Sequence, residues 1–207
     1  MNDKVIIIAE AGGNHNGSLK SAYKLVDIAK RSGADYVKFQ TFKAETLVSK
    51  KAPKASYQKK NEKKKSHFEM LKKLEMSHDM HVRIINYCKK KNIKFLSSPF
   101  CLDSFNLLMK FNLDFIKIPS GEITNLPLLR HISKFGKNII LSTGMSEEAE
   151  IKNALKILRK KKRKIILLPC NTEYPTPFKD VNLNAMHYLK KKFKIDVGYS
   201  DHSLGLE

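Results

Sequence analysis

Short apolar runs alternate with amphipathic segments along the whole of this chain of 207 residues. The apolar runs have the length of β-strands and are almost continuous, which is typical of parallel strands covered on both faces. Between them, apolar residues recur at the spacing of one helix face. The alternation predicts a parallel sheet with helices packed outside it. Seven strands are predicted, in the stretches KVIIIAE, ADYVKFQ, IKFLSS, DFIKIPS, NIILST, KIILLPC and IDVGYS.

Helix boundaries are predicted from capping residues and glycines. Ser18 and Ser146 each precede a helical pattern, which their side-chain oxygens can cap. Gly33 follows the first of these helices and is expected to end it. Further helices are predicted over residues 66–74, 77–91, 102–111, 126–135 and 182–192.

Two architectures accommodate a parallel βα chain: an open doubly wound sheet and a closed barrel. No GxGxxG motif follows the first strand. Polar residues follow nearly every strand and are not gathered at a single crevice. In a barrel, catalytic groups come from the C-terminal ends of several strands, so these features favour a TIM-type (β/α)8 barrel. Such a barrel has eight strands and typically about 250 residues. We therefore expect an incomplete barrel over residues 1–207, with about seven strands present and the eighth βα unit missing.

One segment, from Thr41 to Glu75, separates the second strand from its helix and interrupts the alternation. It is much longer than most βα loops, and loops of this length are usually functional or disordered. It also contains a lysine-rich run.

Lys38 and Lys117 lie inside otherwise apolar strands. An unpaired charge in such a position is costly, so each lysine is expected to have an anionic partner, either a protein carboxylate or a ligand. Hydroxyls at strand ends are less informative, because βα loops are polar in any case.

The chain carries 40 Lys and Arg against 20 Asp and Glu, a formal net charge of +20. Such an excess invites comparison with nucleic-acid-binding proteins. The lysines are spread over many segments, however, and no basic motif is interleaved with aromatic residues. We therefore expect a generally lysine-rich surface and no nucleic-acid partner, with a positive field that attracts small anions.

The three cysteines, Cys88, Cys101 and Cys170, are odd in number and lack a CxxC spacing. This indicates reduced thiols rather than a disulfide framework or a zinc site. The first apolar run is too short for a signal peptide, and no stretch approaches transmembrane length. The expectation is a cytoplasmic protein without a membrane partner.

The stretch AEAGGNHNGSLKSAYKLVDIAKRSGADYVKFQTFKAETLV resembles the N-terminus of the sialic acid synthase family. The resemblance continues in order through MLKKLEMS, FLSSPF, IKIPSGEITNLPLL, ILSTGMS, EYPTP, VNLNAM and VGYSDHSLG. KFQTFKAETL and EITNLPLL are more similar to the neuraminate and legionaminate branches than to the pseudaminate branch. The family includes N-acetylneuraminate, legionaminate and pseudaminate synthases.

The resemblance implies a (β/α)8 barrel followed by a small antifreeze-like domain, in a domain-swapped homodimer. The implied reaction condenses phosphoenolpyruvate with an N-acylated amino-sugar aldehyde of the N-acetylmannosamine type. Its products are a nonulosonic acid and phosphate, and it requires Mn²⁺ or Mg²⁺. The antifreeze-like domain is expected to be absent from residues 1–207, and this chain alone is expected to be inactive or nearly so.

The resemblance also implies roles for strand-end side chains. Lys38 and Lys117 would hold the anionic groups of phosphoenolpyruvate, and Glu10 would stabilise positive charge or move a proton. His202 would be a metal ligand, and His15, with Asn14, would shape the pocket floor or instead order the first βα turn. Hydroxyl contacts with substrate are implied for Ser98, Ser120, Ser142, Thr172 and Ser200. Contacts with the amino sugar are implied for Gln40, Glu122 and Tyr174.

The chain departs from the family pattern in three places. Ser98 replaces a threonine but keeps the hydroxyl, Pro169 replaces a histidine, and Thr172 stands where Asn or Ser is common. The resemblance places the second metal histidine on the eighth strand, outside this chain.

Two other functions stay open. The chain could be a non-catalytic, polyanion-binding barrel fragment, or another barrel aldolase or synthase that uses phosphoenolpyruvate.

Overall fold

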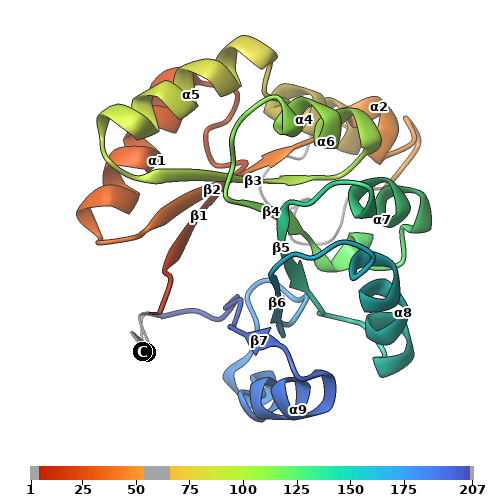
Figure 1. The fold of residues 1–207 in the computed structure, drawn as a ribbon. Helices are drawn as coiled ribbons and strands as arrows, with labels where there is room; N and C mark the ends of the chain where they lie inside the picture. Colours follow the sequence, from red (N-terminus) through yellow and green to blue (C-terminus); the bar gives the residue numbers. More distant parts are fainter. Residues whose placement is uncertain (1–4, 54–65, 206–207) are drawn as a thin grey trace. The chain divides into compact units, whose positions relative to one another are not determined.

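The computed structural model describes residues 5–53 and 66–205, and the chain divides into two compact units, residues 1–113 and 114–207 (Figure 1). The first unit contains a parallel sheet in the order β1-β2-β3. Its strands are β1 (Ile8–Gly12), β2 (Tyr36–Thr41) and β3 (Lys94–Pro99). Its helices are α1 (Leu19–Arg31), α2 (Ala44–Leu47), α4 (His67–Leu74), α5 (His78–Lys90) and α6 (Leu102–Met109).

The second unit contains a parallel sheet in the order β4-β5-β6-β7. Its strands are β4 (Phe115–Ile118), β5 (Asn138–Ser142), β6 (Ile165–Leu168) and β7 (Asp196–Val197). Its helices are α7 (Leu126–Ser133), α8 (Glu148–Leu158) and α9 (Asn184–Phe193), with short 3-10 turns η1 (Ser120–Glu122) and η2 (Phe178–Asp180). Neither sheet reverses its strand order within the described residues, as a doubly wound sheet would.

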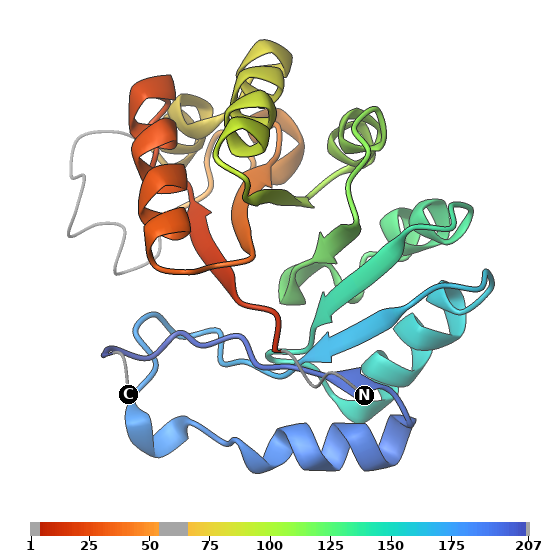
Figure 2. The same cartoon turned by 60° about the vertical axis from the view of Figure 1, so that its left-hand side comes forward.

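The core of each unit lies between its sheet and its helices. In the first unit α1 packs against β1, β2 and α5, and Figures 1 and 2 show α1 and α5 side by side on one face of the sheet. Val37 and Phe39 of β2 are fully buried on this face. Side chains alternate between the two faces of a strand, so Lys38 and Gln40 lie on the opposite face.

The predicted capping of α1 is confirmed, since the Ser18 side chain accepts a hydrogen bond from the amide of Ser21. Gly33 follows this helix with φ +78, the left-handed conformation that glycine adopts without a Cβ clash. The helix predicted over 66–74 is confirmed as α4, which Ser66 and Glu69 close with a reciprocal capping box. The lysine-rich run before it falls largely in residues 54–65, outside the described residues.

Several predicted boundaries were wrong. Ser146 does not cap α8, because its hydroxyl donates to the Gly144 carbonyl and Glu147 caps the helix instead, in a capping box with Glu150. The helices predicted to end at residues 111 and 135 end at Met109 and Ser133. The helix predicted over 182–192 spans Asn184–Phe193.

The seventh strand is shorter than predicted, because only Asp196 and Val197 form regular ladder pairs with β6. Two hydrogen bonds extend the pairing, from Gly198 to the Leu167 carbonyl and from Ser200 to the Pro169 carbonyl. Ser200 is therefore still held at the end of β6.

Of the helices that the structure describes, none is long and apolar enough to cross a membrane.

Candidate active site

In the first unit, four predicted site residues share the sheet face that lies away from α1 and α5. Glu10 is in register with Lys38, and Gln40 is in register with Ser98 on the neighbouring strand. Residues in register on parallel strands point to the same side of the sheet. The structure therefore brings together one carboxylate, one ammonium group, one amide and one hydroxyl.

The expected anionic partner of Lys38 is a protein carboxylate. Lys38 forms an ion pair with Glu10, and only 14% of the Lys38 side chain is exposed against 48% of that of Glu10. The pair holds a cation near the end of β2 without leaving its charge uncompensated. An anion bound beside Lys38 would share this cation with Glu10.

His15 orders the first βα turn. Its ring is buried, and its Nδ1 accepts a hydrogen bond from the Gly17 amide at 3.0 Å. Burial lowers the pKa of His15 and so favours the neutral ring. Because Nδ1 accepts the Gly17 hydrogen bond, the proton of the neutral ring is on Nε2. Gly17 itself has φ +75, and a Cβ there would lie 2.6 Å from the Lys73 carbonyl oxygen at the end of α4. The turn after β1 is thus packed directly against α4.

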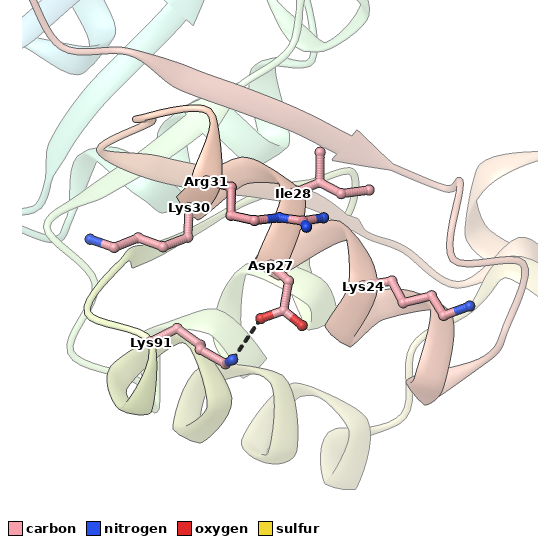
Figure 3. A pocket seen from close by; sticks show the side chains of 6 residues that line it. All are labelled: Lys24, Asp27, Ile28, Lys30, Arg31 and Lys91. Atoms are coloured by element: carbon pink, nitrogen blue, oxygen red, sulfur yellow. Dashed lines mark ion pairs between the residues drawn. The ribbon is translucent and has the colours of Figure 1, made fainter.

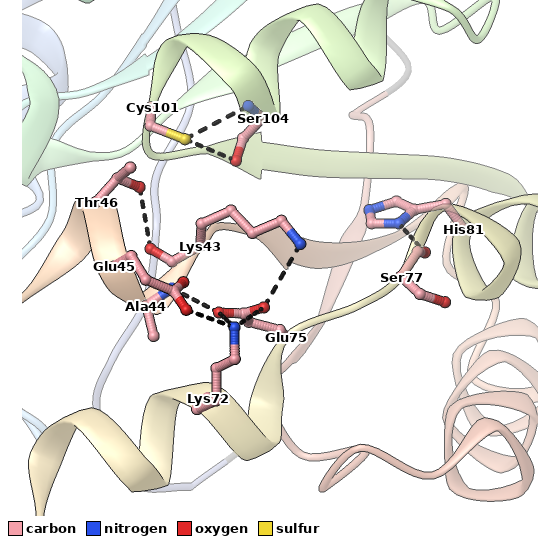
Figure 4. Close-up of polar contacts among 10 residues, drawn as sticks. All are labelled: Lys43, Ala44, Glu45, Thr46, Lys72, Glu75, Ser77, His81, Cys101 and Ser104. Atoms are coloured by element: carbon pink, nitrogen blue, oxygen red, sulfur yellow. Dashed lines mark hydrogen bonds and ion pairs between the residues drawn. The ribbon is translucent and has the colours of Figure 1, made fainter.

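The loop after β2 is also held by residues around α4, as Figure 4 shows. The Glu75 carboxylate accepts the Ala44 amide at 2.7 Å and pairs with Lys43 and Lys72. Lys72 also pairs with Glu45, at 2.6 Å. The insertion between β2 and α5 therefore anchors the loop that follows Lys38 and Gln40.

A second polar network lies on the helix side of the same strand ends. The fully buried His81 hydrogen-bonds the Thr41 hydroxyl through Nε2 at 2.8 Å, and Thr41 hydrogen-bonds Ser97 at 2.7 Å. His81 Nδ1 donates to the Ser77 carbonyl at 2.8 Å, which leaves Nε2 as the acceptor of the Thr41 proton (Figure 4). Thr41 and Ser97 adjoin the candidate site residues Gln40 and Ser98 along the chain, so the network fixes the backbone that carries them.

In the second unit, Lys117 lies on the sheet face that also carries Ser142. Lys117 is 5% exposed, and its ammonium donates to the Ser142 hydroxyl at 2.6 Å and to the Ile118 carbonyl at 3.4 Å. The opposite face of this sheet is apolar and buried. Lys117 and Ser142 thus form a buried pair of donors at the ends of β4 and β5.

Ser120 joins three strand ends. Its hydroxyl accepts the Gly144 amide at 2.9 Å and lies 3.3 Å from the Cys170 sulfur. A Cβ at Gly144 would lie 2.8 Å from that sulfur, so the close approach of the loops after β4, β5 and β6 requires glycine there. Glu122, further along η1, accepts a hydrogen bond from the side chain of Asn125.

His202 is held in one tautomer by the protein. Its Nδ1 lies in hydrogen-bond contact with the Asn171 carbonyl, which can only accept, so Nδ1 carries the proton. Nε2 then presents a lone pair, 3.0 Å from the Tyr174 hydroxyl and 3.4 Å from that of Ser200. The Tyr174 and His202 rings stack with centroids 4.2 Å apart.

This arrangement suits a metal ligand, because histidine ligands commonly donate their second N–H to a carbonyl. The Tyr174 hydroxyl would have to turn away from Nε2 when a metal binds. Among residues 5–53 and 66–205, no cluster of three or more His, Cys, Asp or Glu side chains is arranged to hold a metal ion. A metal ion bound to His202 would therefore need ligands from outside these residues, or ligands other than His, Cys, Asp and Glu side chains.

The last predicted hydroxyl, that of Thr172, donates to the Met145 sulfur at 3.6 Å. In its described contacts, the second unit thus brings together Lys117 with Ser142, Thr172 with Met145, and Tyr174 with Ser200 and His202. Sequence reasoning missed the contact of Met145 with Thr172 and the Asn171 carbonyl that orients His202. No sequence signal identifies either one, since a backbone carbonyl and a left-handed methionine depend on the folded loops.

A pocket on the helix side of the first unit lies elsewhere (Figure 3). It is lined by Lys24, Asp27, Ile28, Lys30, Arg31 and Lys91. A hydrogen bond from Lys91 lowers the pKa of Asp27. Arg31 and Lys91 come shortly before β2 and β3 along the chain, so this pocket lies at the beginnings of the strands rather than at their carboxyl ends.

The chain matches the model of the NeuB family over residues 25–207. It belongs to the NeuB family. The N,N'-diacetyllegionaminic acid synthase of Campylobacter jejuni is 55% identical to it, over 98% of this chain and 62% of that protein. The enzyme of the same name from Legionella pneumophila is 45% identical, over 97% of this chain and 58% of that protein. This NeuB-family chain thus spans about 60% of the length of these curated relatives.

Solved structures agree with this assignment. The N-acetylneuraminic acid synthetase of Leptospira borgpetersenii superposes with a TM-score of 0.89 at 35% identity, over 100% of this chain and 68% of that one. A truncated 3-deoxy-D-arabino-heptulosonate 7-phosphate synthase of Thermotoga maritima has a TM-score of 0.67 at 13% identity, over 98% of this chain and 69% of that one, and supports the fold alone. Both neighbours are TIM-type barrels, which confirms the predicted fold class for this NeuB-family chain, with seven strands in the described residues.

Proposed function

We propose that this NeuB-family chain catalyses, as part of its enzyme, the condensation of phosphoenolpyruvate with an N-acylated amino-sugar aldehyde. The observation that carries the proposal is 55% identity to a protein named N,N'-diacetyllegionaminic acid synthase. The two lysines set in apolar strands support it, because a substrate with a carboxylate and a phosphate needs cations held in place. The chemical class is a carbon–carbon bond-forming transferase.

The reaction forms one carbon–carbon bond and releases phosphate. C3 of phosphoenolpyruvate attacks the aldehyde carbon, and the aldehyde oxygen becomes a hydroxyl after it takes a proton. Water adds to C2, the bond from C2 to the phosphate oxygen breaks, and a 2-keto acid remains. The site must therefore hold two anionic groups, orient an aldehyde and stabilise positive charge at C2.

The side chains of the chain divide these tasks. Lys38 and Lys117 bind the carboxylate and phosphate of phosphoenolpyruvate, and Glu10 stabilises positive charge at C2 or moves a proton. The bound anion is also contacted by the hydroxyls of Ser98, Ser120, Ser142, Thr172 and Ser200. The amino sugar is contacted by Gln40, Glu122 and Tyr174.

A divalent ion, Mn²⁺ or Mg²⁺, would supply Lewis-acid polarisation of the aldehyde oxygen. His202 would hold it through Nε2, and the Asn171 carbonyl would fix the other ring nitrogen, Nδ1, as a hydrogen-bond donor. We further propose that the enzyme is cytoplasmic and works as a homodimer. Light scattering of the purified protein would test the dimer.

The experiment is a phosphate-release assay on the enzyme with Mn²⁺. Release should require phosphoenolpyruvate together with N-acetylmannosamine or a diacetylated bacillosamine-derived sugar. Release with a non-acylated aldose instead would favour another phosphoenolpyruvate-using barrel synthase. The 207-residue chain alone is predicted to turn over little, and rapid release by it would contradict that prediction.

A polyanion-binding role would appear as salt-sensitive binding of nucleic acid without any binding of phosphoenolpyruvate.

A further inference from the structure

Asn125 connects the start of α7 to Glu122, one of the residues proposed to contact the amino sugar. It is the N-cap residue of α7, and its side-chain Oδ1 accepts a hydrogen bond from the Leu128 amide at 3.1 Å. Its Nδ2 donates to Oε2 of Glu122 at 2.6 Å. One side-chain amide therefore has its acceptor bound to a helix and its donor bound to a carboxylate.

These two partners allow the Asn125 amide only one orientation. A backbone N–H can only donate and an ionised carboxylate can only accept, so Oδ1 faces Leu128 and Nδ2 faces Glu122. The helix is a rigid support for the amide, because Leu128 and Leu129 are buried in the core of the second unit. A helix cap needs only an oxygen, which aspartate or serine would supply equally well. The amide nitrogen of Asn125 thus has a second use, which is to hold Glu122.

Backbone hydrogen bonds hold the same segment but leave the Glu122 side chain to be fixed. The Asn125 amide donates to the Glu122 carbonyl at 3.1 Å, and the Ile123 amide donates to the Ser120 carbonyl at 3.2 Å. These bonds fix the backbone of η1 against α7. A glutamate side chain still has several rotatable bonds, whose freedom is lost when the carboxylate is held in one place. The hydrogen bond from Nδ2 of Asn125 holds that carboxylate.

A carboxylate that is held by one oxygen can bind a ligand with the other. Asn125 donates to Oε2, and Oε1 can accept a hydrogen bond from a hydroxyl or from the acylamino N–H of a sugar. A side chain that is ordered before the ligand arrives costs less entropy when the ligand binds. We infer that Asn125 is a positioning residue, which acts on the amino sugar by holding the Glu122 carboxylate. The inference rests on the proposed function, which assigns Glu122 to the sugar.

The variant Asn125→Asp separates helix capping from positioning. Aspartate caps helices as well as asparagine does, so the unfolding temperature should stay near that of wild type. Its carboxylate repels that of Glu122, however, and should turn it away. We expect the KM for N-acetylmannosamine to rise about tenfold, the effect of losing a hydrogen bond to a charged group, while the KM for phosphoenolpyruvate stays unchanged.

Two further variants serve as comparisons. Asn125→Ser keeps a cap and adds no charge, so it should raise the KM for the sugar less than Asn125→Asp does. Asn153→Asp adds the same charge at an exposed asparagine of α8 and should leave both KM values unchanged.

A double variant tests whether Asn125 acts through Glu122. Glu122→Gln removes the carboxylate and should itself raise the KM for the sugar. In that background Asn125→Asp has no carboxylate to repel, and the glutamine amide can donate to the new aspartate. The KM for the sugar should therefore rise no further. A full additional rise would overturn the inference, because Asn125 would then act independently of Glu122.

The side-chain amide of Asn125 offers a measurement that does not depend on turnover. Its ¹⁵N-labelled signal can be observed by NMR and assigned by its loss in Asn125→Ser. The signal should shift in Glu122→Gln, because the acceptor of its hydrogen bond changes. It should shift again when N-acetylmannosamine is added to the wild-type protein with phosphoenolpyruvate and Mg²⁺.

The outcomes distinguish this inference from the proposed function. An Asn125 signal that is unchanged in Glu122→Gln or at saturating sugar overturns the inference, as does an unchanged sugar KM in Asn125→Asp. Phosphate release together with any of these results leaves the proposed function standing. A shift of the Asn125 signal with sugar, but without phosphate release, contradicts the proposed function and supports the contact between Glu122 and the sugar.

Discussion

Replacing Thr41 by valine should destabilise the first unit through two lost hydrogen bonds and no lost volume. The Thr41 hydroxyl connects the fully buried His81 to Ser97. Valine has the same shape, so no cavity forms, but His81 Nε2 loses its donor and the Ser97 hydroxyl loses a partner. A buried polar group without a partner costs about 1–3 kcal/mol, so the free energy of unfolding should fall by about 2 kcal/mol or more.

The assay is urea unfolding followed by circular dichroism, arranged as a double-mutant cycle with His81→Phe. Phenylalanine keeps a ring beside Phe95 and Phe111 and removes the unsatisfied nitrogen. The double variant should therefore lose less stability than the sum of the single variants, by about 1 kcal/mol. Thr124→Val, at an exposed threonine, should stay within about 0.5 kcal/mol of wild type. Additive losses, or a Thr41→Val variant as stable as wild type, would refute the reasoning.

Three further predictions concern pH, thiols and metal. Burial lowers the pKa of His81 from its ordinary 6.5. The unfolded chain therefore binds a proton at His81 more readily than the folded chain does. As a consequence, the free energy of unfolding should fall as the pH drops from 6.5 through the lowered pKa. Urea unfolding at pH values on both sides of 6.5 should show this loss, with a smaller pH dependence in His81→Phe; an identical dependence would contradict it. Burial raises the pKa of Cys88 to about 12. A thiol reagent should therefore modify Cys101 and Cys170 in the native protein, and Cys88 only after unfolding. Rapid modification of Cys88 in the native protein would contradict this prediction. His202→Ala should weaken Mn²⁺ binding at least about tenfold by electron paramagnetic resonance, and unchanged affinity would remove His202 from the metal site.

The order of strands and helices could be predicted because apolar periodicity depends on local sequence. Ser18 caps its helix as predicted, because a cap needs only its own helix. Ser146 does not, because its hydroxyl finds a competing acceptor in the loop. The seventh strand was predicted too long because its regular pairing with β6 ends at Val197.

The sequence did not predict which candidate site residues contact one another. The cost of burying a charge predicted an anionic partner for Lys38, yet only the register of β1 with β2 identifies Glu10 as that partner. The orientation of His202 depends on a backbone carbonyl 31 residues away in the sequence. Met145 has its conformation because loops after three strands meet, and no local pattern encodes that meeting.

The central claim is that this chain binds phosphoenolpyruvate through its two strand lysines. Isothermal titration of the 207-residue chain with phosphoenolpyruvate and Mn²⁺ measures this directly. The account predicts one saturable site that Lys38→Met and Lys117→Met each weaken at least about tenfold, because each removes a charge-assisted contact. Lys156→Met, at an exposed lysine of α8, should bind as wild type does. The absence of saturable binding, or binding that neither strand lysine affects, would contradict the account.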